Sequence, residues 1–235
     1  MGIGRRHSDG PVQQNECVSL SFESEAHMST VVLIRHGRTY WNAKRKMQGQ
    51  VNIPLNDEGI AQAKRAHDAL ASHAFEVCYS SPLDRSVTTA RLVLGNDTVP
   101  IIKDERLIEH SYGVAEGSCY KHIPLYYRFF TTEYGYAHHP ESYRAPTGGE
   151  TFDDVYRRAG SFIDEVLTPA ARTYGEILIS AHGGINCALL GVILGIPIER
   201  FWSVKLDNCG YAVLDADGRG SYKLTDHTPF IDGTM

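Results

Sequence analysis

The chain has few cysteines, no closely spaced cysteine pair, no long apolar run and no excess of positive charge. Its 235 residues include five cysteines that are widely spaced and odd in number, which argues against a disulfide framework or a C-x-x-C zinc knuckle and predicts free thiols. No apolar run is long enough to span a bilayer. A net charge of −5 argues against general affinity for nucleic acid or an anionic membrane surface. We therefore expect a cytoplasmic protein that binds neither nucleic acid nor membrane.

The length and composition favour one large α/β domain over two small ones. Hydrophobic residues make up 42% of the chain and charged residues 22%, which is ordinary for a globular protein. Residues 1–29 are polar, mixed in charge and without apolar periodicity. We expect this segment to be a flexible tail or an expression leader, with Met28 as an alternative start, and residues 30–235 to form a single catalytic domain.

The rest of the chain is organised around one apolar run that ends in charged residues. Val31 to Ile34 are apolar and mostly β-branched, and Arg35, His36 and Gly37 follow at once. An apolar run without alternation predicts a strand buried on both faces. Open α/β sheets place their ligands at the carboxyl ends of such strands. On these residues alone, a strand ending in a solvated turn is an equal alternative.

The same pattern returns late in the chain. Glu176 to Ala181 predict a second buried strand, followed by His182, Gly183 and Gly184. Other segments predict helices over 56–73, 82–94, 150–173 and 185–194, and strands over 75–79, 99–102, 211–214 and 221–224, the last two as a hairpin. This alternation predicts a doubly wound α/β fold, a three-layer α/β/α sandwich with a mostly parallel sheet.

Four basic side chains occupy equivalent positions in this scheme. His36 and His182 each follow a strand, Arg35 closes the first strand, and Arg85 lies in the first turn of a helix that follows another strand. If those strands are neighbours, the four groups converge on one small volume. Burying unpaired charge is costly, so such a cluster makes a poor core. Guanidinium groups and helix N-termini suit phosphate oxygens, and the cluster therefore predicts an anion site.

This arrangement suggests a chemistry. With the charge of a phosphate neutralised, a neutral histidine can attack phosphorus and form a covalent intermediate. The leaving alkoxide then needs a proton from a nearby acid. Glu109, in the loop after the third predicted strand, is our candidate for this acid, and Glu105 is the rival.

Four motifs together resemble the histidine phosphatase superfamily, which includes the phosphoglycerate mutases. They are Arg35 to Thr39 with Asn42, Ser80 to Arg85, Leu107 to Glu109 with Gly113, and Ser180 to Gly184. The resemblance implies that His36 is the nucleophile that becomes phosphohistidine and that no metal takes part. It also implies a phosphate pocket made by Arg35, Arg85 and His182, with Glu109 as proton donor and with Asn42 and Gly183 at the phosphate region.

Departures from the mutase pattern favour the phosphatase branch. The cofactor-dependent mutases follow the acidic residue with Arg-His-Tyr-Gly, whereas here Glu109 precedes His110-Ser111-Tyr112-Gly113. The cations that the insertion at 117–149 offers are well separated: Lys121, Arg128 and Arg144. We expect a phosphatase acting on a small phosphorylated metabolite, without a cofactor, as a monomer or homodimer. The alternatives are a mutase that uses 2,3-bisphosphoglycerate and a catalytically silent phosphate-binding adaptor.

The segment 117–149 is rich in aromatic residues. They are Tyr120, Tyr126, Tyr127, Phe129, Phe130, Tyr134, Tyr136 and Tyr143. An insertion of this size is typical of a lid, and its rings would favour a substrate with an apolar or sugar-like body; the alternative is that half of them form the apolar underside of the lid. His138 and His139 are expected to be solvated rather than to bind a metal. The basic run at 44–46 is either a solvated face or a means of drawing anions to the site.

Overall fold

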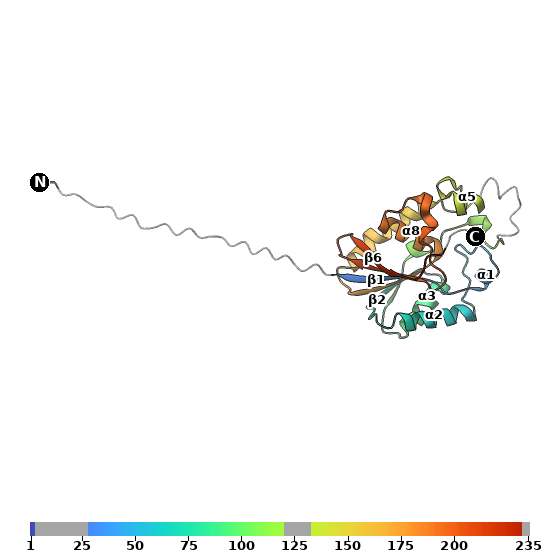
Figure 1. Ribbon diagram of the computed structural model, residues 1–235, viewed down its shortest axis with the longest axis horizontal. Helices are drawn as coiled ribbons and strands as arrows, with labels where there is room; N and C mark the ends of the chain where they lie inside the picture. Colours follow the sequence, from blue (N-terminus) through green and yellow to red (C-terminus); the bar gives the residue numbers. More distant parts are fainter. Residues whose placement is uncertain (3–27, 120–132, 232–235) are drawn as a thin grey trace.

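A six-stranded sheet forms the centre of the protein (Figure 1), in a computed structural model that describes residues 1–2, 28–119 and 133–231. The strand order is β3-β2-β4-β1-β5-β6. The four strands from β3 to β1 run parallel, whereas β5 and β6 are antiparallel to their neighbours. The strands span Ser29–Arg35 (β1), Val77–Ser80 (β2), Ile101–Lys103 (β3), Glu176–Ala181 (β4), Tyr211–Ala216 (β5) and Tyr222–His227 (β6).

Helices cover both faces of this sheet, and each face has its own apolar core. Alternate residues of β1 point to opposite sides: Val31 and Leu33 join one core cluster, and Val32 and Ile34 join the other. Figure 1 shows α2 and α3 on one face and α8 on the other. The helices are α1 (Tyr40–Ala43), α2 (Asp57–Ala69), α3 (Asp84–Leu94), α5 (Glu133–His138), α6 (Phe152–Phe162), α7 (Thr168–Ala170) and α8 (Gly183–Leu194). The predicted doubly wound α/β class is therefore confirmed.

Several predicted boundaries shift, for local reasons. The helix expected over 150–173 is divided into α6, a π-helical turn at Ile163–Leu167 (η5) and α7. Pro169 has no backbone N–H to donate to the carbonyl four residues earlier, so a regular α-helix cannot continue through this point. Helix α2 ends at Ala69 rather than near His73. Helix α8 begins at Gly183, two residues before the predicted start, and this shift brings further backbone N–H groups to the site.

The sequence did not predict the short helices α1 and α5, nor the short 3-10 helices of the described residues. These 3-10 helices are η1 (Glu105–Leu107), η2 (Gly113–Ala115), η4 (Pro140–Ser142) and η6 (Ile198–Val204). Within the described ranges, no single helix is both long and apolar enough to cross a membrane; α8 and η6 pass such a test only as a pair bent by 111°.

An aromatic cluster lies where the predicted lid insertion packs against α6 and η6. Tyr136 of α5 and Tyr143 are buried among His110, Phe152 and Trp202, with ring centroids 4.8 to 5.9 Å apart. The predicted aromatics of residues 120–132 lie outside the described residues, as does the side chain of Tyr134. The buried ring of Tyr143 supports the alternative in which these aromatic residues form the apolar underside of the lid. Tyr136 is also buried, but it lines a cavity as well.

Candidate active site

The two His-Gly motifs meet because β1 and β4 are parallel neighbours. Arg35 pairs with Ala181 in this register, and the next residue of each strand is a histidine. The ring centroids of His36 and His182 are 5.1 Å apart. Strand β2 also pairs with β4, so α3, which follows β2, brings Arg85 to the same edge. The structure thus brings together the four basic groups that the sequence placed at strand ends.

His36 is held as a neutral imidazole with one nitrogen free. Its Nδ1 lies 2.7 Å from the carbonyl oxygen of Gly37. Because a carbonyl only accepts, Nδ1 carries the proton, and Nε2 keeps its lone pair. Burial lowers the pKa of His36 well below its ordinary value, and the positive charges of Arg85 and Arg35 lower it further. Nε2 is therefore available as a nucleophile at neutral pH.

His182 is completely buried behind this ring and takes a different tautomer. The Arg85 Nε donates to its Nδ1 over 3.1 Å, and its Nε2 lies 2.7 Å from Ser81 Oγ. A guanidinium only donates, so His182 Nδ1 is unprotonated and Nε2–H donates to the serine. Burial, followed by Arg85 and His36, lowers the pKa of His182 well below its ordinary value. His182 is not among the residues that line the cavity described below.

The positive charge at the site thus comes from the arginines rather than from all four groups. Arg85 is fully buried and donates from Nη1 to Val51 O and from Nη2 to Gly49 O, both over 2.7 Å. Burial lowers the pKa of Arg85 to about 10, which leaves it protonated at neutral pH. Arg35 donates from Nη1 to Leu206 O over 2.8 Å, but its buried Nε has no partner among the described residues.

The orphaned donor of Arg35 is an argument for a bound anion. A buried N–H without an acceptor costs free energy, and a phosphate oxygen would satisfy it. Gly183 starts α8 directly beside this group: a Cβ at Gly183 would lie 3.4 Å from Arg35 Nε. The glycine therefore leaves room for a ligand oxygen to approach both the guanidinium and the N-terminus of α8.

Glu109 lies across the N-terminus of α8. Its Oε1 accepts from the backbone N–H groups of His110 (2.9 Å), Gly184 (3.0 Å) and Ile185 (3.1 Å). Oε2 accepts only one of these, from Gly184 over 3.2 Å, and so keeps capacity to exchange a proton. Glu109 lines the cavity, whereas its rival Glu105 is exposed and does not. The geometry therefore favours Glu109 over Glu105 as the candidate proton donor.

The loop that carries Glu109 is fastened to α6 by an arginine that the sequence did not identify. Arg158 donates from Nη1 to the carbonyl oxygen of Ile108 over 2.7 Å, and its Nη2 forms an ion pair with Glu150 at 2.8 Å. Gln50 donates to the carbonyl of Glu109 over 3.1 Å. These contacts fix the backbone on both sides of the candidate acid.

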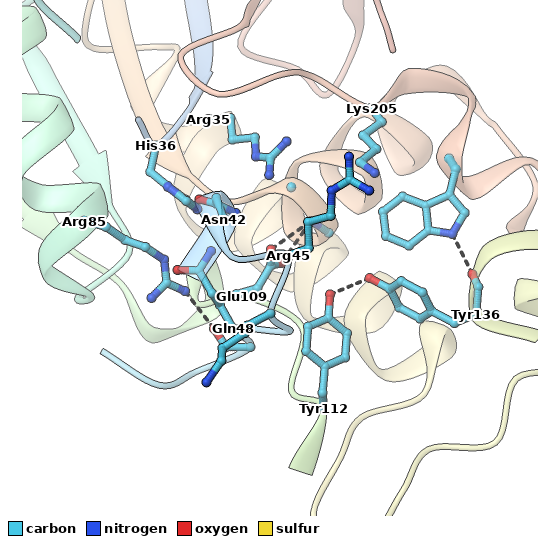
Figure 2. A pocket seen from close by; sticks show the side chains of 15 residues that line it. Arg35, His36, Asn42, Arg45, Gln48, Arg85, Glu109, Tyr112, Tyr136 and Lys205 are labelled. Carbon is cyan, nitrogen blue, oxygen red and sulfur yellow. Dashed lines mark hydrogen bonds between the residues drawn. The ribbon is translucent and has the colours of Figure 1, made fainter. Parts of the chain in front are cut away.

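A cavity of about 170 Å³ opens in front of these groups (Figure 2). Fifteen residues line it: Arg35, His36, Asn42, Arg45, Lys46, Gln48, Gly49, Arg85, Glu109, Tyr112, Tyr136, Gly183, Gly184, Trp202 and Lys205. The Oδ1 atom of Asn42 is used in the capping box of α1 with Thr39, which leaves its amide nitrogen to face the cavity. Arg45 and Lys46 belong to the basic run predicted either to be solvated or to attract anions; Arg45 is exposed, Lys46 is half-buried, and both line the cavity.

Sequence reasoning missed the wall opposite His36. Trp202 and Lys205 come from the segment after α8, for which no element was predicted. A lysine between two buried apolar residues, Val204 and Leu206, is the signal that could have pointed to it. No group of three or more His, Cys, Asp or Glu residues that could hold a metal ion occurs within residues 1–2, 28–119 and 133–231.

The comparisons with known proteins agree with this geometry. Residues 31–226 match the family model of the histidine phosphatase superfamily (branch 1). The chain is 28% identical to phosphoserine phosphatase 1 of Hydrogenobacter thermophilus over 82% of this chain and 89% of that protein. It is 27% identical to a 2,3-bisphosphoglycerate-dependent phosphoglycerate mutase of Gloeobacter violaceus, over 83% and 89%. Among solved structures, Bacillus stearothermophilus YhfR matches with a TM-score of 0.77 and 28% identity, over 88% of this chain and all (100%) of that one.

The family model matches more than half of the chain. The matched residues include all four motifs, and each motif contributes residues to the cavity. Both phosphatases and mutases occur among the relatives, so the match gives the family and not the substrate. The chain belongs to the histidine phosphatase superfamily.

Proposed function

We propose that the protein hydrolyses phosphomonoesters of small metabolites, without a metal ion, through a phosphohistidine on His36. The observation that carries this proposal is the tautomer of His36. The Gly37 carbonyl fixes the proton on Nδ1, and burial beside two arginines keeps the ring neutral, so Nε2 presents a lone pair to the cavity. A neutral imidazole beside two guanidinium groups is suited to attack a phosphate whose charge those groups neutralise.

In the first step, Nε2 of His36 forms a bond to phosphorus while the ester P–O bond breaks. The leaving oxygen takes a proton from the carboxyl group of Glu109, whose Oε2 has the spare capacity. Arg35 and Arg85 compensate the charge on the phosphoryl oxygens during the transfer.

In the second step, a water molecule attacks the phosphohistidine. Glu109, now a carboxylate, accepts a proton from the water, the N–P bond breaks, and the electron pair returns to Nε2 of His36. Inorganic phosphate leaves, and both groups regain their starting protonation. The hydrogen bond from Arg85 to His182 holds that ring against His36 and orients both sides of the pocket.

Phosphoglycerate mutase activity is the second candidate. Both phosphatases and mutases match the chain. The cavity is also lined by three cations that lie outside the insertion at 117–149, namely Arg45, Lys46 and Lys205. In a mutase the phosphohistidine would pass its phosphoryl group back to a hydroxyl, with 2,3-bisphosphoglycerate as cofactor.

Phosphate release from a panel of phosphomonoesters, measured in EDTA beside a coupled assay for 3-phosphoglycerate isomerisation, distinguishes these activities. We expect release that is insensitive to EDTA and a loss of at least about a thousandfold in kcat for His36→Ala. His227→Ala, which removes an exposed histidine on β6, is the matched control and should keep full activity. Isomerisation stimulated by 2,3-bisphosphoglycerate, with little release, would establish the mutase instead, and silence in both assays would favour an adaptor.

A further inference from the structure

The carbonyl group that fixes the proton of His36 belongs to a peptide that is held on its other side as well. This peptide joins Gly37 to Arg38. Its oxygen accepts the Nδ1–H of His36 over 2.7 Å, and its N–H, the backbone N–H of Arg38, donates to Oε1 of Gln62 over 2.8 Å. A trans peptide directs its C=O and its N–H to opposite sides, and none of the described peptide bonds is cis. The peptide is therefore held between the ring of His36 and the side chain of Gln62.

Gln62 reaches this peptide because α2 approaches the segment after β1 very closely. A Cβ at Gly37 would lie 2.5 Å from the carbonyl oxygen of Gly59, and a Cβ at Gly59 would overlap the carbonyl oxygen of Arg38. Asn56, which caps α2, donates from its backbone N–H to the same carbonyl of Arg38 over 3.0 Å. Gly59 and Gln62 are three residues apart and so share one side of the helix. The side chain of Gln62 is therefore brought to the Arg38 N–H by the way α2 begins.

The preceding peptide, which joins His36 to Gly37, is held by two other side chains. Its carbonyl oxygen accepts from Nδ2 of Asn208 over 3.0 Å, and its N–H donates to Oγ1 of Thr89 over 3.0 Å. The backbone of His36 is fixed by these bonds. The Gly37 carbonyl could still turn away from Nδ1 by rotation of the next peptide, and the hydrogen bond to Gln62 opposes that rotation.

The contact with Gln62 also strengthens the hydrogen bond at the other end of the peptide. When the N–H of an amide donates, the amide becomes more polarised and its oxygen accepts more strongly. In the tautomer with the proton on Nε2, Nδ1 of His36 would turn a lone pair towards the Gly37 oxygen, which can only accept, and the two would repel. Polarisation by Gln62 increases both the attraction in one tautomer and the repulsion in the other. It therefore favours the tautomer that leaves Nε2 of His36 unprotonated.

Helix α2 does not depend on Gln62 to pack against the sheet. Ala63 and Ala66 of α2 belong to the apolar core on this face, and Nδ1 of His67 is hydrogen-bonded to the carbonyl oxygen of Val93 in α3 over 2.7 Å. Among the described residues, the half-buried side chain of Gln62 has no hydrogen bond other than the one from Arg38 N. The polar end of Gln62 is thus used for the peptide beside the nucleophile.

We propose that Gln62 is a positioning residue for the reaction: through the peptide that joins Gly37 to Arg38, it keeps the proton of His36 on Nδ1 and the lone pair of Nε2 towards the cavity. This inference rests on the proposed function, because it explains how the nucleophile of that reaction is kept in its reactive form. Gln62 is not among the residues that line the cavity, so it acts through the peptide and His36 rather than on the substrate.

Three variants of α2 separate the acceptor from the helix that carries it. Gln62→Leu removes the acceptor, and Gln62→Glu keeps one. His67→Leu is the matched control, because it removes another hydrogen bond of α2 without touching the peptide. Gln, Leu and Glu have similar helix propensities, so both substitutions at Gln62 should leave α2 equally stable.

Kinetics of these variants measure the effect on the reaction. In Gln62→Leu we expect kcat/KM for phosphomonoesters to fall about threefold to tenfold, the ratio that corresponds to one neutral hydrogen bond. Gln62→Glu should restore most of the original value, and His67→Leu should stay within about twofold of it. The inhibition constant of inorganic phosphate should change less than about twofold in all three variants, because the arginines that would bind it are untouched.

A measurement of the tautomer itself needs no turnover and separates this inference from the proposed reaction. NMR of the ring nitrogens in isotopically labelled protein distinguishes protonated from unprotonated nitrogen, and the signals of His36 are those lost in His36→Ala. We expect the proton on Nδ1 in the original protein, in Gln62→Glu and in His67→Leu, and a larger share on Nε2 in Gln62→Leu.

Such a shift in Gln62→Leu supports the inference even if phosphate release fails. An unchanged tautomer in Gln62→Leu, with or without a loss of kcat/KM, would overturn it, because Gln62 would then have a structural role alone. An equal shift in His67→Leu would also overturn it, because the packing of α2 rather than the acceptor would be responsible.

Discussion

The most specific prediction concerns Gly184, the second residue of α8. A methyl group at this position would lie 2.7 Å from Oε1 of Glu109 and 3.2 Å from Cβ of His110. Real Cβ atoms essentially never lie closer than 3.0 Å to such atoms, and ordinary contact begins at 3.4 Å. In Gly184→Ala the carboxyl of Glu109 must therefore move, and it loses its short hydrogen bonds to the start of α8.

The expected effect is on catalysis more than on stability. Displacing a reacting group by a large fraction of an ångström costs about tenfold to a hundredfold in rate. Alanine favours a helix over glycine by up to about 1 kcal/mol, which offsets part of the lost hydrogen bonding. Steady-state kcat on the best phosphomonoester, with urea denaturation of the same sample, measures both effects.

Gly160 provides the matched control. It lies inside α6, and a Cβ there would meet nothing within 4 Å. Gly160→Ala should therefore keep kcat and gain about 0.5–1 kcal/mol in the free energy of unfolding. If Gly184→Ala retained kcat within twofold of the original protein, Glu109 would not need its observed position, and our account of the acid would be wrong.

Two further predictions concern protons. Glu109→Gln cannot carry a proton and should lower kcat about a hundredfold or more, whereas Glu105→Gln, at an exposed position, should change it less than twofold; the reverse pattern would reassign the acid. The native pKa values of His36 and His182 lie below the unfolded value near 6.5, so the unfolded chain binds more protons below that pH. The free energy of unfolding should therefore fall as the pH decreases from about 6.5, by up to about 1.4 kcal/mol per pH unit for each histidine. Urea denaturation at about pH 7.5 and about pH 5.5 measures this, and equal stability at both would show that the rings are not held neutral.

The sequence by itself was sufficient for the fold class and for the residues gathered at the sheet edge. Apolar runs that end in Arg35-His36 and Ala181-His182 are local patterns, and local patterns are what hydrophobic periodicity reports. The helix bounds predicted at 56 and 194 lie next to the observed caps, Asn56 of α2 and the left-handed Gly195 of α8, because capping depends on a few neighbouring residues. Once β1 and β4 were assumed to be neighbours, the cluster of two histidines and two arginines followed. The roles of these residues in catalysis stay predictions.

Only the tertiary structure decided which protonation state and which partner each group has. The carbonyl of Gly37 sets the tautomer of His36, and Arg85, far away in the sequence, sets that of His182. Glu109 and Gly184 are 75 positions apart, and nothing in either local sequence indicates that one caps the other. Lys205 was overlooked because a lysine after a short helix has no periodic signal. Burial, tautomer and hydrogen-bond partner are properties of segments brought together by folding. For that reason only the three-dimensional structure favoured Glu109 over Glu105 and placed Lys205 at the cavity.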